Sequence, residues 1–219
     1  MINTASVLNI NFLELKQGID ALVAGGTTCL HIDVMDGHYV PNLCMPVKFI
    51  HEIHQAYPQL TLDVHLMVDD PATYIGQMQE AGTDYFCFHT DSTRFVRRTI
   101  NQIRAAGMKP GITINPSQRI DEMLPYMEYV DMVMLMAVEP GFAGQALLPG
   151  SMERLAEIAE LRKQYGCSFL ISVDGGIDYE KGHQCKEIGV DMIVGTVHTI
   201  FKQPDGITEA CRRFERELG

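Results

Sequence analysis

The strongest constraint on the fold is a regular alternation between short apolar runs and longer amphipathic windows along the chain. Apolar runs bounded by turn-forming residues are typical of buried strands, and the amphipathic windows are typical of helices that pack on them. Strands are predicted over 2–8, 28–35, 60–67, 84–89, 109–115, 130–137, 168–174 and 191–195, and helices over 11–24, 46–56, 70–81, 92–106, 118–127, 149–165, 178–188 and 204–217. Eight such units in 219 residues predict an α/β fold with one (β/α)8 (TIM) barrel domain over residues 1–219.

The charge balance excludes two classes of partner. The formal net charge is −11, and no block of Lys and Arg is present. Such a surface repels both the phosphate backbone of nucleic acid and an anionic membrane, so neither is expected as a partner. A phosphate ligand would then be held mostly by backbone N–H groups at glycine-rich turns and helix N-termini.

The cysteines and the apolar runs indicate a compartment. The six cysteines form no C-x-x-C pair, which is typical of small buried hydrophobes in a reducing environment. No apolar run reaches the roughly 18 residues of a membrane span. The first residues also lack the basic and apolar regions of a signal peptide. We therefore expect a cytoplasmic protein.

Ionisable side chains interrupt three of the predicted strands. Strand side chains alternate between faces, so His31 shares a face with Asp33, and Asp63 shares one with His65. Asp174 ends a third strand, in S-V-D-G-G. A β/α barrel brings such strand ends together. The two imidazoles and the carboxylates of His31, Asp33, His65 and Asp174 therefore predict a site for one divalent metal ion, either Zn²⁺, Fe²⁺, Mn²⁺ or Co²⁺.

Three nearby residues leave alternatives open. Asp63 would either orient the second ring nitrogen of a metal ligand or be a solvated or barrel-bottom carboxylate. His38 follows the metal strand and His89 ends the fourth strand, and either could line a pocket. Neither histidine is predicted to take part in the chemistry.

Four motifs follow one another along the chain: H-I-D-V-M-D-G-H-Y-V-P-N (31–42), D-V-H-L-M-V (63–68), E-P-G-F-A-G-Q (139–145) and V-D-G-G-I (173–177). In these motifs the chain resembles the ribulose-phosphate 3-epimerase family. The resemblance covers nearly the whole chain, and four ordered motifs are more specific than any one of them. It implies a TIM barrel of the ribulose-phosphate-binding type and a phosphorylated ketose as substrate, and it suggests a homo-oligomer.

Asp33 and Asp174 are the predicted catalytic residues. Their strands are far apart around the barrel, so the two carboxylates can approach a planar intermediate from opposite faces, as inversion at carbon requires. One carboxylate removes the proton next to a ketone, the metal polarises the carbonyl and stabilises a cis-enediolate, and the other carboxylate returns a proton to the other face. The resemblance implies that Asp33 is the proton acceptor and Asp174 the donor, and that both bind the metal.

Small-residue turns follow the last three predicted strands and expose successive N–H groups. TIM barrels often bind phosphate at these loops. The predicted phosphate-binding residues are Gly141, Phe142, Ala143, Gly144, Gly175, Gly176, Gly195 and Thr196.

The predicted substrate-binding residues come from other strand ends. Ser6, in A-S-V-L-N-I-N-F, matches the substrate-hydroxyl serine of the family's P-S-x-L-S-A-D-F stretch. His65 is also predicted to bind the substrate. Met35, Met67 and Met136 end inward-facing strands. They would either pack softly in the core or, as the resemblance implies, form a polarisable lid over the reacting carbons.

We therefore expect an isomerase that epimerises a ketose phosphate at C3 with the help of a metal ion. The resemblance implies conversion of D-ribulose 5-phosphate to D-xylulose 5-phosphate. Asn9, Asn11 and Glu139 stand where the family has Ser, Asp and Asn, and the loop after Asn42 is one residue shorter. These departures keep a D-allulose 6-phosphate 3-epimerase as an alternative.

Two rivals belong to other classes of protein. A sugar-phosphate decarboxylase would need an Asp-Lys cluster in the barrel, whereas no predicted strand ends in a Lys. The other rival is a non-catalytic sugar-phosphate binder.

Overall fold

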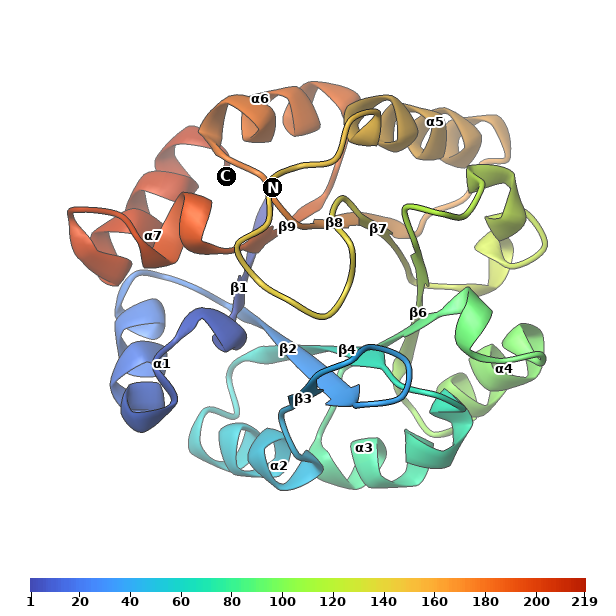
Figure 1. Cartoon of the computed structure of the whole chain (residues 1–219), viewed down its shortest axis with the longest axis horizontal. Coiled ribbons are helices and arrows are strands. Elements are labelled where there is room, and N and C mark those ends of the chain that lie inside the picture. The colour runs from blue at the N-terminus through green and yellow to red at the C-terminus, as the bar shows by residue number, and fades with distance from the viewer.

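The strands of the chain close into a ring. A computed structural model describes residues 1–219. Eight parallel strands follow the order β1-β9-β8-β7-β6-β5-β4-β2, and β1 pairs with β2 to close the barrel. They are β1 (Ile2–Ser6), β2 (Cys29–Asp36), β4 (Thr61–Met67), β5 (Tyr85–His89), β6 (Lys109–Ile114), β7 (Met132–Met136), β8 (Leu170–Asp174) and β9 (Met192–Gly195). Figure 1 shows this ring along its axis with the helices outside it. The predicted (β/α)8 fold and all eight predicted strands are confirmed.

Seven of the eight predicted helices are α-helices in the structure. They are α1 (Leu15–Ala24), α2 (Val47–Ala56), α3 (Ile75–Ala81), α4 (Val96–Ala105), α5 (Ser151–Gln164), α6 (Tyr179–Ile188) and α7 (Gly206–Glu217). The predicted starts of α1, α3 and α4 are too early because short 3₁₀ segments occupy Phe12–Glu14, Pro71–Tyr74 and Thr90–Ser92. No helix combines the length and the apolar character needed to cross a bilayer.

The helix predicted over 118–127 is wrong. The segment holds only two 3₁₀ turns, Ile120–Met123 and Met127–Tyr129. Pro125 lies between them, has no N–H to donate to the residue four positions earlier, and its ring clashes with that residue's carbonyl in an α-helix. The amphipathic pattern is satisfied without a helix, because Ile120, Met123 and Met127 are still buried.

Two apolar layers lie on the two faces of the strands. Residues that point outward, such as Phe86 and Phe88, belong to the large core cluster between strands and helices. Residues that point into the barrel include a separate cluster of Cys29, Cys87, Met132, Met134, Met136, Val138 and Met192. The alternation of side chains along each strand separates the two layers, so the polar residues at the inward positions face one interior.

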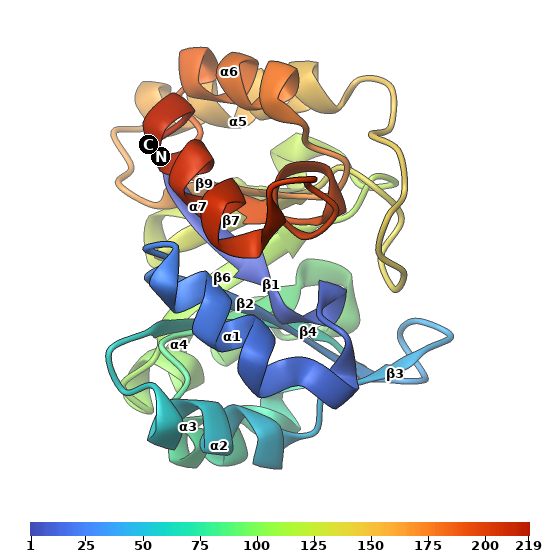
Figure 2. The ribbon, with the colours of Figure 1, turned by 90° about the vertical axis from the view of Figure 1, so that its left-hand side faces the viewer.

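The loops at the C-terminal ends of the strands cover one end of the barrel. A two-residue strand that the sequence did not predict, β3 (Leu43–Cys44), pairs antiparallel with the end of β2. The loop after β7, drawn in yellow, crosses the mouth of the ring in Figure 1. Figure 2 shows this loop and β3 at the same end of the barrel, with both termini at the opposite end. A π-helical turn, Val197–Phe201, follows β9.

Candidate metal and active site

Four ionisable side chains converge at the floor of the barrel mouth. The parallel register of β2 and β4 sets His31 beside Asp63 and Asp33 beside His65. One ligand atom from each of His31, Asp33, His65 and Asp174 lies within 4.8 Å of the other three. The Oδ1 atom of Asp33 is 3.3 Å from Nε2 of His31 and 3.4 Å from Nδ1 of His65.

The unpartnered nitrogens of this cluster fit a metal ion. Nε2 of His31 and Nδ1 of His65 are buried and have no hydrogen-bond partner in the protein. A buried nitrogen without a partner is costly, and a cation that accepts both lone pairs between two carboxylates removes that cost. Two imidazoles and two carboxylates suit a divalent transition metal. The residues present therefore fit the metal ion expected from the sequence.

The charged groups of the cluster shift one another's ionisation. Burial lowers the pKa of His31, but the nearby Asp33 and Asp63 carboxylates raise it well above its ordinary value overall. Burial raises the pKa of Asp33, but the neighbouring His31 and His65 rings lower it below its usual range overall. For Asp174 burial is the largest effect, and its pKa is raised. The two carboxyl groups thus occupy electrostatically different places.

A buried carboxylate supports the His31 ring from below. Nδ1 of His31 lies 2.8 Å from Oδ2 of Asp63, and neither side chain is exposed. The Sγ–H of Cys87 donates to the other carboxylate oxygen over 3.4 Å. The structure decides between the two interpretations of Asp63, because this residue is fully buried and orients a histidine ring. With Nδ1–H donated to Asp63, the lone pair of His31 lies on Nε2, toward Asp33.

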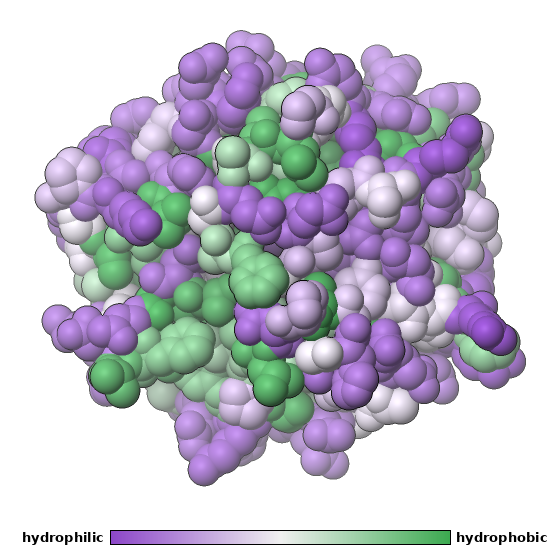
Figure 3. All heavy atoms as spheres, viewed as in Figure 1, coloured by the Kyte–Doolittle hydropathy of each residue, from purple (hydrophilic) through white to green (hydrophobic).

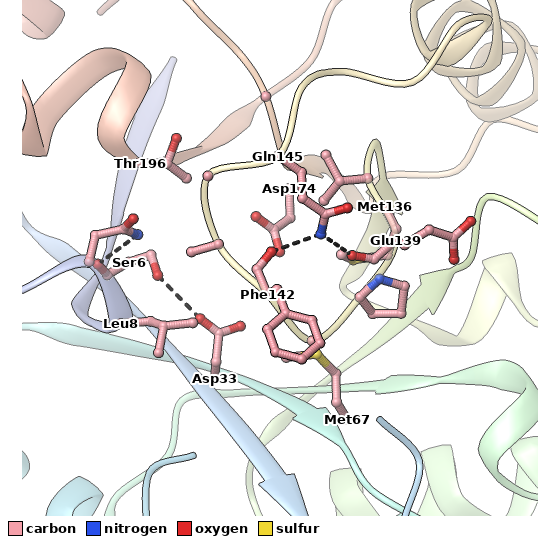
Figure 4. Close-up of a pocket in the computed structure, with 18 of the residues that line it drawn as sticks. Ser6, Leu8, Asp33, Met67, Met136, Glu139, Phe142, Gln145, Asp174 and Thr196 are labelled. Carbon is pink, nitrogen blue, oxygen red and sulfur yellow. Dashed lines mark hydrogen bonds between the residues drawn. The ribbon is translucent and has the colours of Figure 1, made fainter. Parts of the chain in front are cut away.

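A small cavity of about 40 Å³ lies above the four-residue cluster. Figure 4 shows Ser6, Asp33 and Asp174 pointing toward it from different strands. The predicted residues in its wall are Ser6, Asp33, Met35, Met67, Met136, Gly141, Phe142, Ala143, Gly144, Asp174, Gly175, Gly176 and Thr196. His31, His65 and Gly195 are not in the wall. His31 and His65 are fully buried beneath the floor, and Gly195 packs against Asn3 and Ile200.

Ser6 and the three methionines border Asp33 and the space above it. The Ser6 hydroxyl donates to Oδ2 of Asp33 over 3.2 Å. Met35 and Met67 are direct neighbours on β2 and β4, and Met136 ends β7 beside Asp174 of β8. All three methionines are almost fully buried, yet they line the cavity. They therefore pack as core residues and also form an apolar wall of the cavity.

The loop over residues 139–145 covers the cavity and is held at several points. The Gln145 side chain donates to the carbonyl oxygens of Glu139 (2.6 Å) and Phe142 (2.8 Å). The Asn42 side chain donates to the carbonyl of Gly141 over 2.9 Å, which ties the loop to the segment between β2 and β3. Figure 4 shows the two bonds of Gln145 within the cavity wall.

The glycines after β8 allow a close approach of backbone. Gly175 and Gly176 have φ values of +110° and +66°. A Cβ atom on Gly176 would lie 2.4 Å from the backbone nitrogen of Leu147. Only glycine accepts both this conformation and this contact, so the turn leaves its N–H groups free of side-chain cover near Asp174.

The sequence did not single out several residues that shape the site. Leu8 and Gln145 line the cavity, and Gln145 could have been noticed as the last residue of the E-P-G-F-A-G-Q motif. His89, which the sequence suggests only as a pocket residue, instead lies behind His65, with 2.8 Å between the two Nε2 atoms. Its position at the end of an apolar strand was the available signal.

Known proteins resemble this chain in sequence and in fold. The model of the "Ribulose-phosphate 3 epimerase family" matches residues 2–201. A ribulose-phosphate 3-epimerase of Treponema pallidum is 36% identical over 189 residues, which is 86% of each chain. One of Bacillus subtilis is 34% identical over 86% of this chain and 87% of its own. Among solved structures, KGPDC of Streptococcus mutans has a TM-score of 0.72 at 13% identity, with 100% of this chain and 97% of that chain covered. The last similarity shows the fold alone.

Proposed function

Because the chain belongs to the ribulose-phosphate 3-epimerase family and is an isomerase that acts at C3 of a ketose phosphate, we propose that it interconverts D-ribulose 5-phosphate and D-xylulose 5-phosphate. The observation that carries the proposal is the meeting of His31, Asp33, His65 and Asp174 at the floor of one cavity. Two of these residues, Asp33 and Asp174, also line that cavity and can reach a substrate.

We assign the two carboxylates to the two faces of the sugar. Asp33 of β2 and Asp174 at the end of β8 both line the cavity. In the ring, β1 and β9 lie between these two strands. Asp33 accepts the C3 proton of the bound ketose, and Asp174 gives a proton to the other face of the planar enediolate. The reverse reaction exchanges the two roles. The Ser6 hydroxyl holds the Asp33 carboxylate in place through its 3.2 Å hydrogen bond.

His31, Asp33, His65 and Asp174 would hold the divalent metal ion, which is Zn²⁺, Fe²⁺, Mn²⁺ or Co²⁺. When bound, such an ion polarises the ketone and stabilises negative charge that develops on oxygen. The chain's own contribution is orientation, since Asp63 fixes the His31 ring. Met35, Met67 and Met136 exclude water above the reacting carbons, which discourages protonation by solvent.

The glycine turns are proposed to hold the phosphate. Thr196 and the loops around Gly141, Gly144 and Gly176 border the cavity on the side of Asp174. No Lys or Arg lines the cavity, so neutral donors would bind the phosphate, mostly backbone N–H groups together with the Thr196 hydroxyl. The cavity is smaller than the roughly 300 Å³ of a small ligand pocket, so we propose that the loop over 139–145 moves outward when a sugar phosphate enters.

A D-allulose 6-phosphate 3-epimerase is the second candidate. Asn9 and Glu139, two of the departures from the family pattern, both line the cavity and could contact a longer sugar. Turnover of the two ketose phosphates by the same sample separates the candidates. We expect a higher kcat/KM for D-ribulose 5-phosphate, and a higher value for the hexulose phosphate would overturn our first choice.

Chelation tests the metal part of the proposal. Exhaustive dialysis against a chelator should abolish epimerisation, and one equivalent of Co²⁺ or Mn²⁺ should restore it. Full activity of a sample verified as metal-free would contradict the proposal. Binding of substrate without any turnover by the metal-loaded protein would instead favour a non-catalytic binder.

We also propose that residues 1–219 act as one domain and that copies of it form a homo-oligomer. Figure 3 shows hydrophobic side chains gathered on the face of the barrel mouth. Leu13 is 96% exposed and Leu43 is 75% exposed. Leu43 and Phe12 line an apolar groove that contains no charged residue. The residues that form this groove are Phe12, Val34, Met35, Leu43, Cys44, Met45, Pro46, Val47 and Tyr74. A second copy of a chain with a charge of −11 meets the least repulsion at such a groove.

Sedimentation analysis tests this association. The wild-type chain should sediment as an oligomer, and the double substitution Leu13→Asp with Leu43→Asp should give a monomer. A wild-type chain that is monomeric at all concentrations would contradict it.

A further inference from the structure

The two histidines of the proposed metal site are supported by different partners. His31 is backed by the carboxylate of Asp63. His65 is backed by a second imidazole, because its Nε2 atom lies 2.8 Å from Nε2 of His89. The two rings have centroids 4.9 Å apart, and neither side chain is exposed. The register pairs His65 with Cys87, so His89 is its diagonal neighbour on the inner face of the barrel.

We propose that His89 is a positioning residue that fixes the tautomer of His65 by accepting its Nε2–H. The inference rests on the proposed function, since it assumes that His65 binds a metal ion through Nδ1. This nitrogen faces Asp33 at 3.4 Å and Asp174 at 3.9 Å.

The proton positions on the two rings depend on each other. A nitrogen that binds a metal must be unprotonated, so the single N–H of neutral His65 is on Nε2. Nε2 of His89 must then be an acceptor, which places the proton of His89 on Nδ1. If His89 instead carried its proton on Nε2, that nitrogen would donate to His65. The proton of His65 would then move to Nδ1 and occupy the metal position.

The surroundings of His89 favour the required tautomer. Its Nδ1 atom and the side-chain oxygen of Asn115 are both buried, and neither has a hydrogen-bond partner in the structure. The amide of Asn115 is oriented by Asp91, which accepts from its nitrogen over 2.9 Å and from the Tyr39 hydroxyl over 2.7 Å. This leaves the amide oxygen of Asn115 free to accept. The Tyr39 ring covers His89 at a centroid distance of 4.6 Å.

Asp63 and His89 therefore make the two ligand rings unequal. A carboxylate acceptor transfers negative charge to the His31 ring through a charge-assisted bond, whereas an imidazole acceptor fixes the ring without adding charge. His89 keeps His65 a neutral, weaker donor in a cluster that already holds Asp33, Asp63 and Asp174. This cluster contains three carboxylates and no Lys or Arg. A fourth carboxylate behind His65 would therefore increase the repulsion between the negative charges.

Cobalt titration of full-length variants tests the proposal. The metal-free protein is titrated with Co²⁺ while visible absorption is recorded, which reports both the dissociation constant and the ligand geometry. His89→Phe keeps a ring but removes the acceptor, and it should weaken Co²⁺ binding about 10- to 100-fold. His89→Gln places an amide oxygen where Nε2 lies. Its Co²⁺ dissociation constant should stay within about threefold of the wild-type value, which is a smaller change than the full loss of one neutral hydrogen bond would cause.

The control variant lies next to His89 but points to the other face of β5. Phe88→Leu loses packing in the outer core and should lower the melting temperature without changing the Co²⁺ spectrum. Equal losses in His89→Phe and His89→Gln, or wild-type Co²⁺ binding in His89→Phe, would overturn the role of His89. A wild-type chain that binds no Co²⁺ would instead overturn the proposed function itself.

A second measurement needs no substitution. In the Zn²⁺-loaded protein, long-range ¹H–¹⁵N correlation spectra assign the protonated ring nitrogen of each histidine. We expect the proton on Nε2 of His65 and on Nδ1 of His89. A proton on Nε2 of His89 would contradict the proposal even if the variants failed to fold.

Discussion

The two sides of the barrel mouth build their parts of the site in different ways. On the side of β2, β4 and β5, the site consists of buried side chains that hydrogen-bond one another, such as His31 with Asp63 and His65 with His89. On the side of β7, β8 and β9, it consists of glycine turns, the loop over 139–145 and the partly exposed Asp174.

This difference corresponds to what each side is proposed to hold. A resident metal ion requires ligands fixed in advance, and buried hydrogen bonds supply that rigidity. A sugar phosphate enters and leaves in every turnover, so its binding groups lie in loops whose backbone can approach it closely. Asp33 and Asp174 face each other across this boundary.

Removing either carboxylate should have the largest effect. Asp33→Asn and Asp174→Asn should each lower kcat by about 10³-fold or more, because each variant loses a proton-transfer group and a metal ligand. Steady-state kinetics with metal analysis of each sample measure this. Asp178→Asn is the control, since this residue only caps α6 and asparagine caps equally well. A wild-type kcat in either catalytic variant would contradict the proposal that each side of the barrel mouth supplies one catalytic carboxylate.

On the metal side, removing Asp63 should weaken metal binding. Asp63→Leu leaves Nδ1 of His31 without its acceptor and should raise the Co²⁺ dissociation constant about 10- to 100-fold. Isothermal titration measures it. Asp84→Asn is the control, because it also removes a carboxylate that accepts a hydrogen bond. Asp84 accepts from the backbone N–H of Leu62 over 2.8 Å and touches no metal ligand. Unchanged Co²⁺ affinity in Asp63→Leu would show that the buried support of His31 is not needed.

On the substrate side, a methyl group on Gly176 should affect substrate binding rather than the metal. Gly176→Ala would push the turn away from Leu147 and should raise KM about tenfold, the size of one hydrogen bond to a charged group, with Co²⁺ affinity unchanged. Gly166→Ala has the same backbone strain, with φ +65° and open space around the position, and should leave KM unchanged. A loss of metal affinity in Gly176→Ala would contradict the separation of the two sides.

The smallest effect is expected where the two sides touch. Asn42→Ala removes the 2.9 Å hydrogen bond to Gly141 and should change KM by about two- to tenfold, because one neutral hydrogen bond is lost. Rapid-mixing measurements of substrate binding would show whether the loop over 139–145 then opens faster. Asn11→Ala is the control, since Asn11 caps a 3₁₀ turn away from the cavity. An unchanged opening rate would contradict the proposal that the Asn42 side chain restrains the loop over 139–145.

The fold could be predicted from the sequence wherever one local pattern determined the structure. The buried parallel strands are continuous apolar runs, and all eight of them were found. The helix over 118–127 was not predicted correctly, because Pro125 interrupts the backbone bonds without disturbing the amphipathic pattern. β3 has only two residues, which is too short for any periodicity to appear.

The site could be predicted only in part for a related reason. Alternation along one strand indicates that His31 and Asp33 share a face, and a barrel brings strand ends together. The contact between His65 and His89 depends on the register between two strands, which no single segment contains.

The central claim is that separate carboxylates serve the two faces of the sugar, and isotope transfer tests it most directly. D-ribulose 5-phosphate with hydrogen at C3 is converted in D₂O, and the D-xylulose 5-phosphate formed in the first turnovers is examined by NMR. Asp33 removes one proton while Asp174, equilibrated with solvent, delivers another. The account therefore predicts deuterium at C3 of nearly all of the product. Product that keeps the original hydrogen at C3 would contradict it.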